Sequence, residues 1–340
     1  MIRARGLTRR FMIKKEAVDA VRGIDLDVEA GRLVAFLGPN GAGKSTTLRM
    51  LTSLLPPTSG TATVAGHDVV SDPAGVRARI GYVGQKNGAG ENFRVRDELV
   101  TQGRCYGLNR REAGRRADEV LDRLELGSLA DRKPGTLSGG QRRRLDIALG
   151  LVHRPALLFL DEPSTGLDPQ SRANIWDHIL RLREDHGTTL FLTTHYLEEA
   201  DSMAERVVII DHGRIIADGT AERLKGDLAG DRITVTLHDG SQTVRAAEIA
   251  ERIAGAGAVT TGDTTVWLRV PRADVTLPEY LRSLEASGVK AAAAETSRPT
   301  LDDVFLALTG RSLREGDETG PDVPAVPAAP DGRNVPETPA

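Results

Sequence analysis

The chain has 340 residues and a formal net charge of −3, which excludes the strong positive field typical of nucleic-acid-binding proteins. Its apolar runs, such as residues 156–160, fall far short of the roughly 18 residues that a membrane-spanning helix needs, and no charged leader opens it. Cys105 is its only cysteine, so an internal disulfide and a thiolate zinc cluster are excluded and a cytoplasmic protein is expected.

Residues 1 to about 220 alternate short apolar runs with amphipathic segments, the pattern of an α/β domain. A buried strand is predicted over residues 33–37, followed by a helix that begins near Lys44 and ends before Pro56. A charged helix is predicted over residues 110–126, and another over residues 141–152. Further strands of the same sheet are predicted over residues 80–83, 157–160, 189–193 and 206–211.

The segment after residue 230 has a different pattern. Strands are predicted over residues 233–237, 265–270 and 289–294, and helices over residues 246–254 and 278–286. This order indicates a small α+β module of the ferredoxin-like type, followed by a short apolar helix over residues 301–309. We therefore predict three parts: an α/β domain over 1–228, an α+β accessory domain over 229–312, and a disordered Pro/Ala-rich tail over 313–340.

The first chemical motif lies between the strand at 33–37 and the helix at Lys44. Residues 38–45 match the phosphate-loop pattern at every defined position. Glycines let several backbone N–H groups approach a triphosphate, and the helix directs its positive end at the same phosphates. Lys44 is expected to reach the β- and γ-phosphates, and Ser45 to ligate Mg²⁺. The expected ATP-binding residues here are Gly38, Asn40, Gly41, Ala42, Gly43, Lys44, Ser45 and Thr46.

The second motif is a pair of carboxylates, Asp161 and Glu162, at the end of the strand at 157–160. Ligands gather at this end of the strands in open α/β sheets. Asp161 suits the Mg²⁺ shell, and Glu162 suits polarising the water that attacks the γ-phosphate. An acidic junction with no chemical task is the competing interpretation, and the upstream phosphate loop disfavours it.

The third motif is Leu137-Ser138-Gly139-Gly140-Gln141, directly before the helix at 141–152. Ser138 is a good N-cap residue, which is the purely structural interpretation. Two glycines at a helix start also leave bare N–H groups facing outward, a second anion site. One monomer does not need two triphosphate cradles, whereas a head-to-tail homodimer does, with Ser138, Gly140 and Gln141 closing the nucleotide of the other copy.

With these motifs the chain resembles the nucleotide-binding subunit of an ABC transporter over roughly residues 2–220. The resemblance implies a RecA-like core with a helical subdomain, and it assigns further roles to four residues. Phe11 would stack on adenine, although Phe is less usual there than Tyr. Gln85 would sense Mg²⁺ and the membrane partner, Asp168 would lie in the loop that crosses to the other subunit, and His195 would contact the γ-phosphate.

Three strings narrow the resemblance to the daunorubicin-resistance type of drug-export ATPase: residues 141–148, 193–201 and 301–310. The last string lies outside the ATPase core and so discriminates best. The resemblance implies export of a drug through a separately encoded membrane permease, with this chain peripheral at the cytoplasmic face of the plasma membrane. One departure is the glycine-rich stretch at 86–91, which faces the transport subunit in the family and has few apolar side chains.

Several alternatives stay open at this point. A soluble ABC ATPase that remodels ribosomes or DNA is disfavoured, because the chain has one set of motifs and no sustained heptad run. A lipid, polysaccharide or ion cargo is a second alternative. Residues 232–310 suit a packing appendage better than a regulatory or dimer-stabilising module. The run Arg142–Arg144 is interpreted as a solvated helix surface rather than a nucleic-acid patch.

Overall fold

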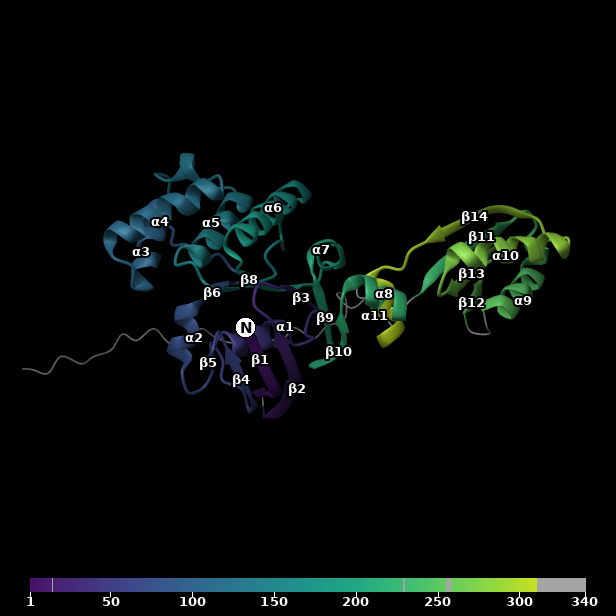
Figure 1. The fold of residues 1–340 in the computed structure, drawn as a ribbon, viewed down its shortest axis with the longest axis horizontal. Coiled ribbons are helices and arrows are strands. Elements are labelled where there is room, and N and C mark those ends of the chain that lie inside the picture. The colour runs from purple at the N-terminus through teal and green to yellow at the C-terminus, as the bar shows by residue number, and fades with distance from the viewer. Residues whose placement is uncertain (14, 229, 255–257, 311–340) are drawn as a thin grey trace, which may run out of the picture.

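The computed structural model describes residues 1–13, 15–228, 230–254 and 258–310; the predicted disordered tail lies outside them. Figure 1 shows an N-terminal unit of sheets and helices, and an accessory unit joined to it beside helices α8 and α11. Among the described residues, no helix combines the length and the apolar character that crossing a lipid bilayer demands.

A six-stranded sheet forms the centre of the N-terminal unit, in the order β10-β9-β3-β8-β7-β6. Its strands are β3 (Leu33–Leu37), β6 (Ile80–Val83), β7 (Leu157–Asp161), β8 (Thr189–Thr194), β9 (Arg206–Asp211) and β10 (Arg214–Gly219). All neighbours are parallel except β9 and β10. β3, β7 and β8 are buried along their whole length, as expected for parallel strands covered on both faces. The predicted strands are confirmed.

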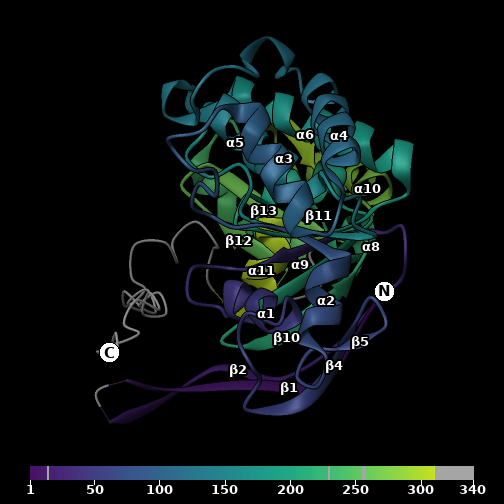
Figure 2. The same ribbon diagram turned by 90° about the vertical axis from the view of Figure 1, so that its left-hand side faces the viewer.

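A second, antiparallel sheet covers one face of the central sheet, in the order β2-β1-β4-β5. Its strands are β1 (Ile2–Ile13), β2 (Glu16–Val28), β4 (Ser59–Val64) and β5 (His67–Asp68). Alternate residues, such as Leu7, Ile24 and Val64, pack with Phe36, Phe159 and Phe191 of the central sheet into one core. Figure 2 shows β1 and β2 running together on the side opposite helices α3 to α5.

Helices complete the unit. They are α1 (Lys44–Leu51), α2 (Pro73–Arg79), α3 (Val95–Cys105), α4 (Arg110–Arg123), α5 (Gly139–Leu151), α6 (Pro169–His186), α7 (Leu197–Met203) and α8 (Ala221–Leu228). Helices α1 and α2 pack into the core shared with the antiparallel sheet, and α3 to α8 cover the other face of the central sheet. Short 3₁₀ turns lie at Gly127–Leu129, Pro134–Thr136 and Gly240–Gln242. Helices α3, α4 and α5 form a group above the sheet in Figure 1, and their apolar faces share a core with β3 and β7.

The accessory unit has the element order β11 (Asp231–Leu237), α9 (Thr243–Ala254), β12 (Val259–Thr261), β13 (Thr265–Val270), α10 (Ala273–Ala286) and β14 (Ala291–Ser297). Its strands form an antiparallel sheet in the order β12-β13-β11-β14, the ferredoxin-like arrangement that the sequence predicts. Several details differ from the sequence prediction, including the start of α9 at Thr243 and the bounds of β14. β12 is an additional strand, and α10 begins at Ala273, with Pro278 inside the helix rather than at its start.

Helix α11 (Leu301–Thr309) returns from the accessory unit to the N-terminal unit. Thr300 and Asp303 form a capping box at its start, and the helix packs against α8 and α7. Leu301, Val304 and Phe305 are at most 1% exposed and belong to the core cluster of the central sheet. The division at residues 228 and 312 stays a prediction, and the apolar side of α11 lies in the N-terminal core.

We expect Phe305→Ala to lower the free energy of unfolding by about 3–5 kcal/mol, because it leaves a cavity where an aromatic ring is 0% exposed. Leu306→Ala is the matched control, since Leu306 follows directly on the same helix and is 37% exposed. Its expected cost is below about 1 kcal/mol. Urea unfolding of both variants measures the difference, and equal costs would contradict the packing of α11 described here.

We expect the protein to lose stability in mild acid because of the buried side chain of His153. Its ring stacks on Tyr106 with a centroid distance of 3.6 Å and lies 3.0 Å from the Ile80 carbonyl oxygen. Burial lowers the pKa of His153 to about 4, below its ordinary value of 6.5. The unfolded chain therefore binds the extra proton between these values, and stability falls as pH falls through this window, by at most about 1.4 kcal/mol per unit.

The matched variant is His153→Gln, which has no titrating ring. Urea unfolding at pH 7 and pH 5 is expected to show a smaller loss of stability in the variant than in the parent chain. An equal loss in both proteins would mean that other groups account for the acid sensitivity.

Candidate functional site

The phosphate loop joins β3 to α1, and close packing requires two of its three glycines. A Cβ on Gly38 would lie 2.3 Å from the Ile210 carbonyl oxygen. Gly43 has a φ of +106°, and a Cβ there would lie 2.6 Å from the Ala20 carbonyl oxygen. The backbone of the loop therefore packs directly against β9 and β2, and glycines in such a loop also allow backbone N–H groups to approach an anion closely. Within it Ala42 is buried, Asn40 is exposed and Thr46 is half-buried at the start of α1.

Lys44 is a buried cation held inside this loop. Its side chain is 4% exposed, and Nζ donates to the carbonyl oxygens of Gly38 at 2.6 Å and Pro39 at 3.1 Å. The ammonium also lies 3.5 Å from Oε1 of Glu162. A buried charge is stable only with such partners, so Lys44 is held in the loop before any phosphate arrives.

Ser45, in the first turn of α1, is hydrogen-bonded to Asp161 at the end of β7. Ser45 Oγ donates to Asp161 Oδ1 at 3.0 Å, and Gln85 Nε2 donates to Ser45 Oγ at 3.3 Å. Burial raises the pKa of Asp161, against the hydrogen bonds from Thr193 and Ser45. Hydroxyl, carboxylate and amide oxygens are the hard donors that Mg²⁺ prefers, and a turn of the Gln85 amide would present its oxygen. The donor set therefore fits Mg²⁺.

Glu162 lies between Lys44 and His195 at the end of β7. Its Oε2 is 3.3 Å from Nδ1 of His195 and accepts a hydrogen bond from Thr165 Oγ1 at 3.2 Å. Burial alone would raise the pKa of Glu162, but His195 and Lys44 outweigh burial and lower it. Glu162 is therefore a carboxylate at neutral pH. Its φ of +48° is a strained value for a side chain of this size.

Thr193 holds both carboxylate residues, and the sequence analysis did not single it out. Thr193 Oγ1 donates to Asp161 Oδ1 at 2.7 Å. The backbone N–H of Glu162 donates to Thr193 Oγ1 and to the Thr193 carbonyl oxygen, both at 3.1 Å. Thr193 is 0% exposed. The feature that could have identified Thr193 is its position in β8, the strand beside β7, where it is in register with Asp161.

Ser138 and Gly140 lie at the start of α5, and their contacts are with α5 and α6. Ser138 Oγ accepts from the Gln141 N–H at 3.3 Å, and the Ser138 N–H donates to Gln141 Oε1 at 3.0 Å, forming a capping box. A Cβ on Gly140 would lie 2.9 Å from Ser171 Oγ. Asp168 caps α6 and accepts from that same Ser171 hydroxyl at 2.6 Å.

The site residues thus form two groups. Lys44, Ser45, Gln85, Asp161, Glu162 and His195 are linked by the contacts described above, whereas Ser138, Gly140, Gln141 and Asp168 form a second group around the starts of α5 and α6. Phe11 lies apart from both on β1, half-buried, with the Arg9 guanidinium 4.7 Å from its ring centre. Its stacking on adenine stays a prediction.

The interpretation of Arg142–Arg144 as a solvated surface is wrong. Arg143 is only 6% exposed, and it donates to the carbonyl oxygens of Gly84, Asp161, Glu162 and Pro163. Arg144 donates to the Leu124 carbonyl oxygen. Burial lowers the pKa of Arg143, which remains a cation. Periodicity alone placed the three arginines on different faces of the helix but could not show which face is covered.

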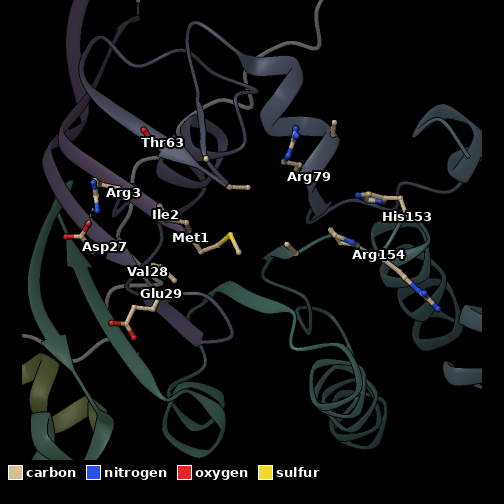
Figure 3. Close-up of a pocket in the computed structure, with 15 residues that line it drawn as sticks. Met1, Ile2, Arg3, Asp27, Val28, Glu29, Thr63, Arg79, His153 and Arg154 are labelled. Atoms are coloured by element: carbon tan, nitrogen blue, oxygen red, sulfur yellow. Dashed lines mark ion pairs between the residues drawn. The ribbon is translucent and has the colours of Figure 1, made fainter.

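A cavity of about 840 Å³ lies away from these motifs (Figure 3). Arg3, Asp27 and Glu29 lie on one side of it, with Arg79, His153 and Arg154 on the other. Its lining includes residues 78–79 and 153–156, directly before β6 and β7 begin, whereas Asp161 and Glu162 lie where β7 ends. Arg3 is paired with Asp27, and Arg154 with Glu119. The cavity is therefore separate from the candidate site.

Known proteins resemble this chain in sequence and in fold. The family model described as ABC transporter matches residues 21–165. The daunorubicin/doxorubicin resistance ATP-binding protein DrrA of Streptomyces peucetius is 46% identical over 294 residues, covering 86% of this chain and 88% of that protein. The Nod factor export ATP-binding protein I of Cupriavidus metallidurans is 37% identical over 302 residues, covering 87% and 94%.

Among solved structures, the dimeric ATP-binding cassette MJ0796, in a post-hydrolysis state bound to ADP and Pi, has a TM-score of 0.60 with 26% identity. The match covers 65% of this chain and 98% of that one.

Proposed function

Since this chain belongs to the family of ABC transporter ATP-binding proteins, we propose that it hydrolyses ATP to drive export of a drug or antibiotic through a separate membrane permease. The observation that carries the proposal is the linked cluster of Lys44, Ser45, Asp161, Glu162 and His195 beside a bare glycine cradle. The relatives favour this function over a soluble remodelling ATPase, because both are named as ATP-binding proteins of resistance or export.

In this proposal each residue of the site has its own role in ATP binding or hydrolysis. The loop N–H groups and Lys44 bind the β- and γ-phosphates, and Lys44 exchanges its Glu162 partner for them. Ser45 and Asp161, with Gln85, would hold Mg²⁺, whose charge would offset that of the phosphates. Glu162, freed from Lys44, accepts the proton of the attacking water. His195 orients Glu162 and the γ-phosphate.

We further propose that two copies assemble head to tail around two ATP molecules. Ser138, Gly140 and the start of α5 then face the phosphates bound by the other copy, and Asp168 lies at the junction. Each bare helix end contributes partial positive charge and free N–H groups there. The dimeric cassette among the solved structures supports this arrangement.

The partner is proposed to be a separately encoded permease, which would hold this chain at the cytoplasmic face of the membrane. Nucleic acid is not proposed as a ligand, given the net charge of −3. A drug cargo is proposed from the relative that is 46% identical, and the relative named for Nod factor export represents the competing type of cargo.

Co-purification and cargo stimulation test this proposal. The tagged chain is expected to bring down one membrane protein from solubilised membranes, and the reconstituted pair to hydrolyse ATP faster in the presence of daunorubicin. Stimulation by a lipid-linked saccharide but not by daunorubicin would change the cargo. Recovery of the chain with no membrane protein would contradict the transporter assignment.

A further inference from the structure

Helix α5 carries two buried charged residues that reach different parts of the site. Arg143 and Asp146 are one turn apart, so both lie on the same side of the helix. They are 6% and 5% exposed, and Arg143 Nη1 lies 4.0 Å from Asp146 Oδ2. The N-terminus of this same helix carries Ser138 and Gly140.

Arg143 holds the backbone around the carboxylates. Its Nε donates to the Pro163 carbonyl oxygen at 2.6 Å, and Nη2 lies 3.3 Å from the carbonyl oxygens of Asp161 and Glu162. Its Nη1 donates to the Gly84 carbonyl oxygen at 2.6 Å, directly before Gln85. One guanidinium therefore joins the end of β7 to the start of the Gln85 loop.

Asp146 holds the other end of that loop. Its Oδ1 accepts from the backbone N–H groups of Gly88 at 2.9 Å and Ala89 at 3.2 Å. Its Oδ2 is buried without a hydrogen bond, so Arg143 supplies the nearby charge that offsets it. These contacts fix a glycine-rich stretch that has few apolar side chains of its own to anchor it.

We propose that Arg143 and Asp146 are positioning residues that link the segment 86–91 to the backbone of Glu162 and to the Ser138 end of α5. The inference rests on the proposed function, in which this chain binds a membrane permease, and on the implication of the resemblance that this segment faces the permease. Movement of the segment then shifts α5 and the carboxylates together. Coupling between two sites is reciprocal, so nucleotide binding must also change the segment.

Amide hydrogen exchange on the full chain tests this link without the permease. In the Glu162→Gln background, Mg·ATP is expected to slow exchange at Gly88 and Ala89 by about 5-fold. Asp146→Ala and Arg143→Gln are each expected to speed exchange and to remove the difference between the ATP-bound and free states. Asp146→Asn keeps an acceptor oxygen of the same shape and is expected to restore most of that difference.

Arg144→Gln is the matched control, because it removes the same charge from the next residue of α5. It is expected to keep the ATP-dependent difference of the parent. A purely structural role would speed exchange in both states while leaving the difference intact. Retention of the difference in Asp146→Ala and Arg143→Gln, or in whichever of them folds, would overturn the inference. Failure of the proposed function would be seen in a different experiment: the tagged parent chain would co-purify with no membrane protein.

Discussion

Glu162→Gln is expected to lower the rate of ATP hydrolysis by about 10²–10⁴-fold while ATP binding persists. The amide keeps the shape of the side chain but cannot accept the proton of the attacking water, and general-base catalysis contributes about 10²–10⁴-fold. In the free protein Glu162 is an ionised carboxylate that can accept a proton, because His195 and Lys44 lower its pKa despite burial. With hydrolysis blocked, the ATP-bound dimer should accumulate. Phosphate release and light scattering measure the two effects.

Glu222→Gln is the control for this variant. Glu222 is an exposed carboxylate in the first turn of α8, away from the site. It is expected to hydrolyse ATP within about twofold of the parent rate. If Glu162→Gln also turns over ATP at the parent rate, Glu162 is not the base.

Lys44→Ala is expected to weaken ATP binding by at least about 100-fold. Charge-assisted hydrogen bonds to phosphate are among the strongest polar contacts, and this cation already lies in the loop at 4% exposure. The substitution also removes one partner of Glu162, and leaving a buried carboxylate without its cation costs about 3–5 kcal/mol. The free protein should therefore unfold at lower urea. Calorimetric titration with ATP and urea unfolding measure both effects.

Lys225→Ala is the matched control, since it also removes an ammonium from an ion pair, with Asp201 at 2.7 Å. That pair joins α8 to α7, outside the site, and its side chains are 23% and 35% exposed. Its loss should cost below about 1 kcal/mol and leave ATP binding intact. An ATP affinity in Lys44→Ala close to that of the control would contradict the role given to Lys44.

The sequence could predict the parts of the site that local backbone requirements define. The phosphate loop needs bare glycines at fixed spacing, and a buried strand ending in Asp161 and Glu162 must present them at one edge of the sheet. These features are determined by residues that are close together in the sequence. The strands at 33–37, 157–160 and 189–193 were predicted for the same reason, because fully buried strands are continuous apolar runs.

What the sequence could not predict depends on tertiary packing. Arg143 is identical in type to its neighbours, and only the contact of α5 with the end of β7 makes it a buried donor. Thr193 acts because β8 lies beside β7 in parallel register. The hairpin of β1 and β2 was not predicted, since its register shifts interrupt the alternation of apolar residues. The residues of α11 do not indicate that the helix packs against the N-terminal unit rather than the accessory unit.

The central claim is that each ATP is closed by a second copy of this chain, and mixing two inactive variants tests it directly. Glu162→Gln disables the catalytic side of a site, and Ser138→Arg disables the closing side. In a head-to-tail dimer of one copy of each, one site carries both defects and the other carries none.

The variants are mixed in equal amounts before Mg·ATP is added. We expect each alone to be inactive and the mixture to recover up to about a quarter of the parent ATPase rate, because half of the dimers are mixed and one of their two sites is intact. A mixture that stays inactive at every ratio, while both variants bind ATP, would contradict the shared site.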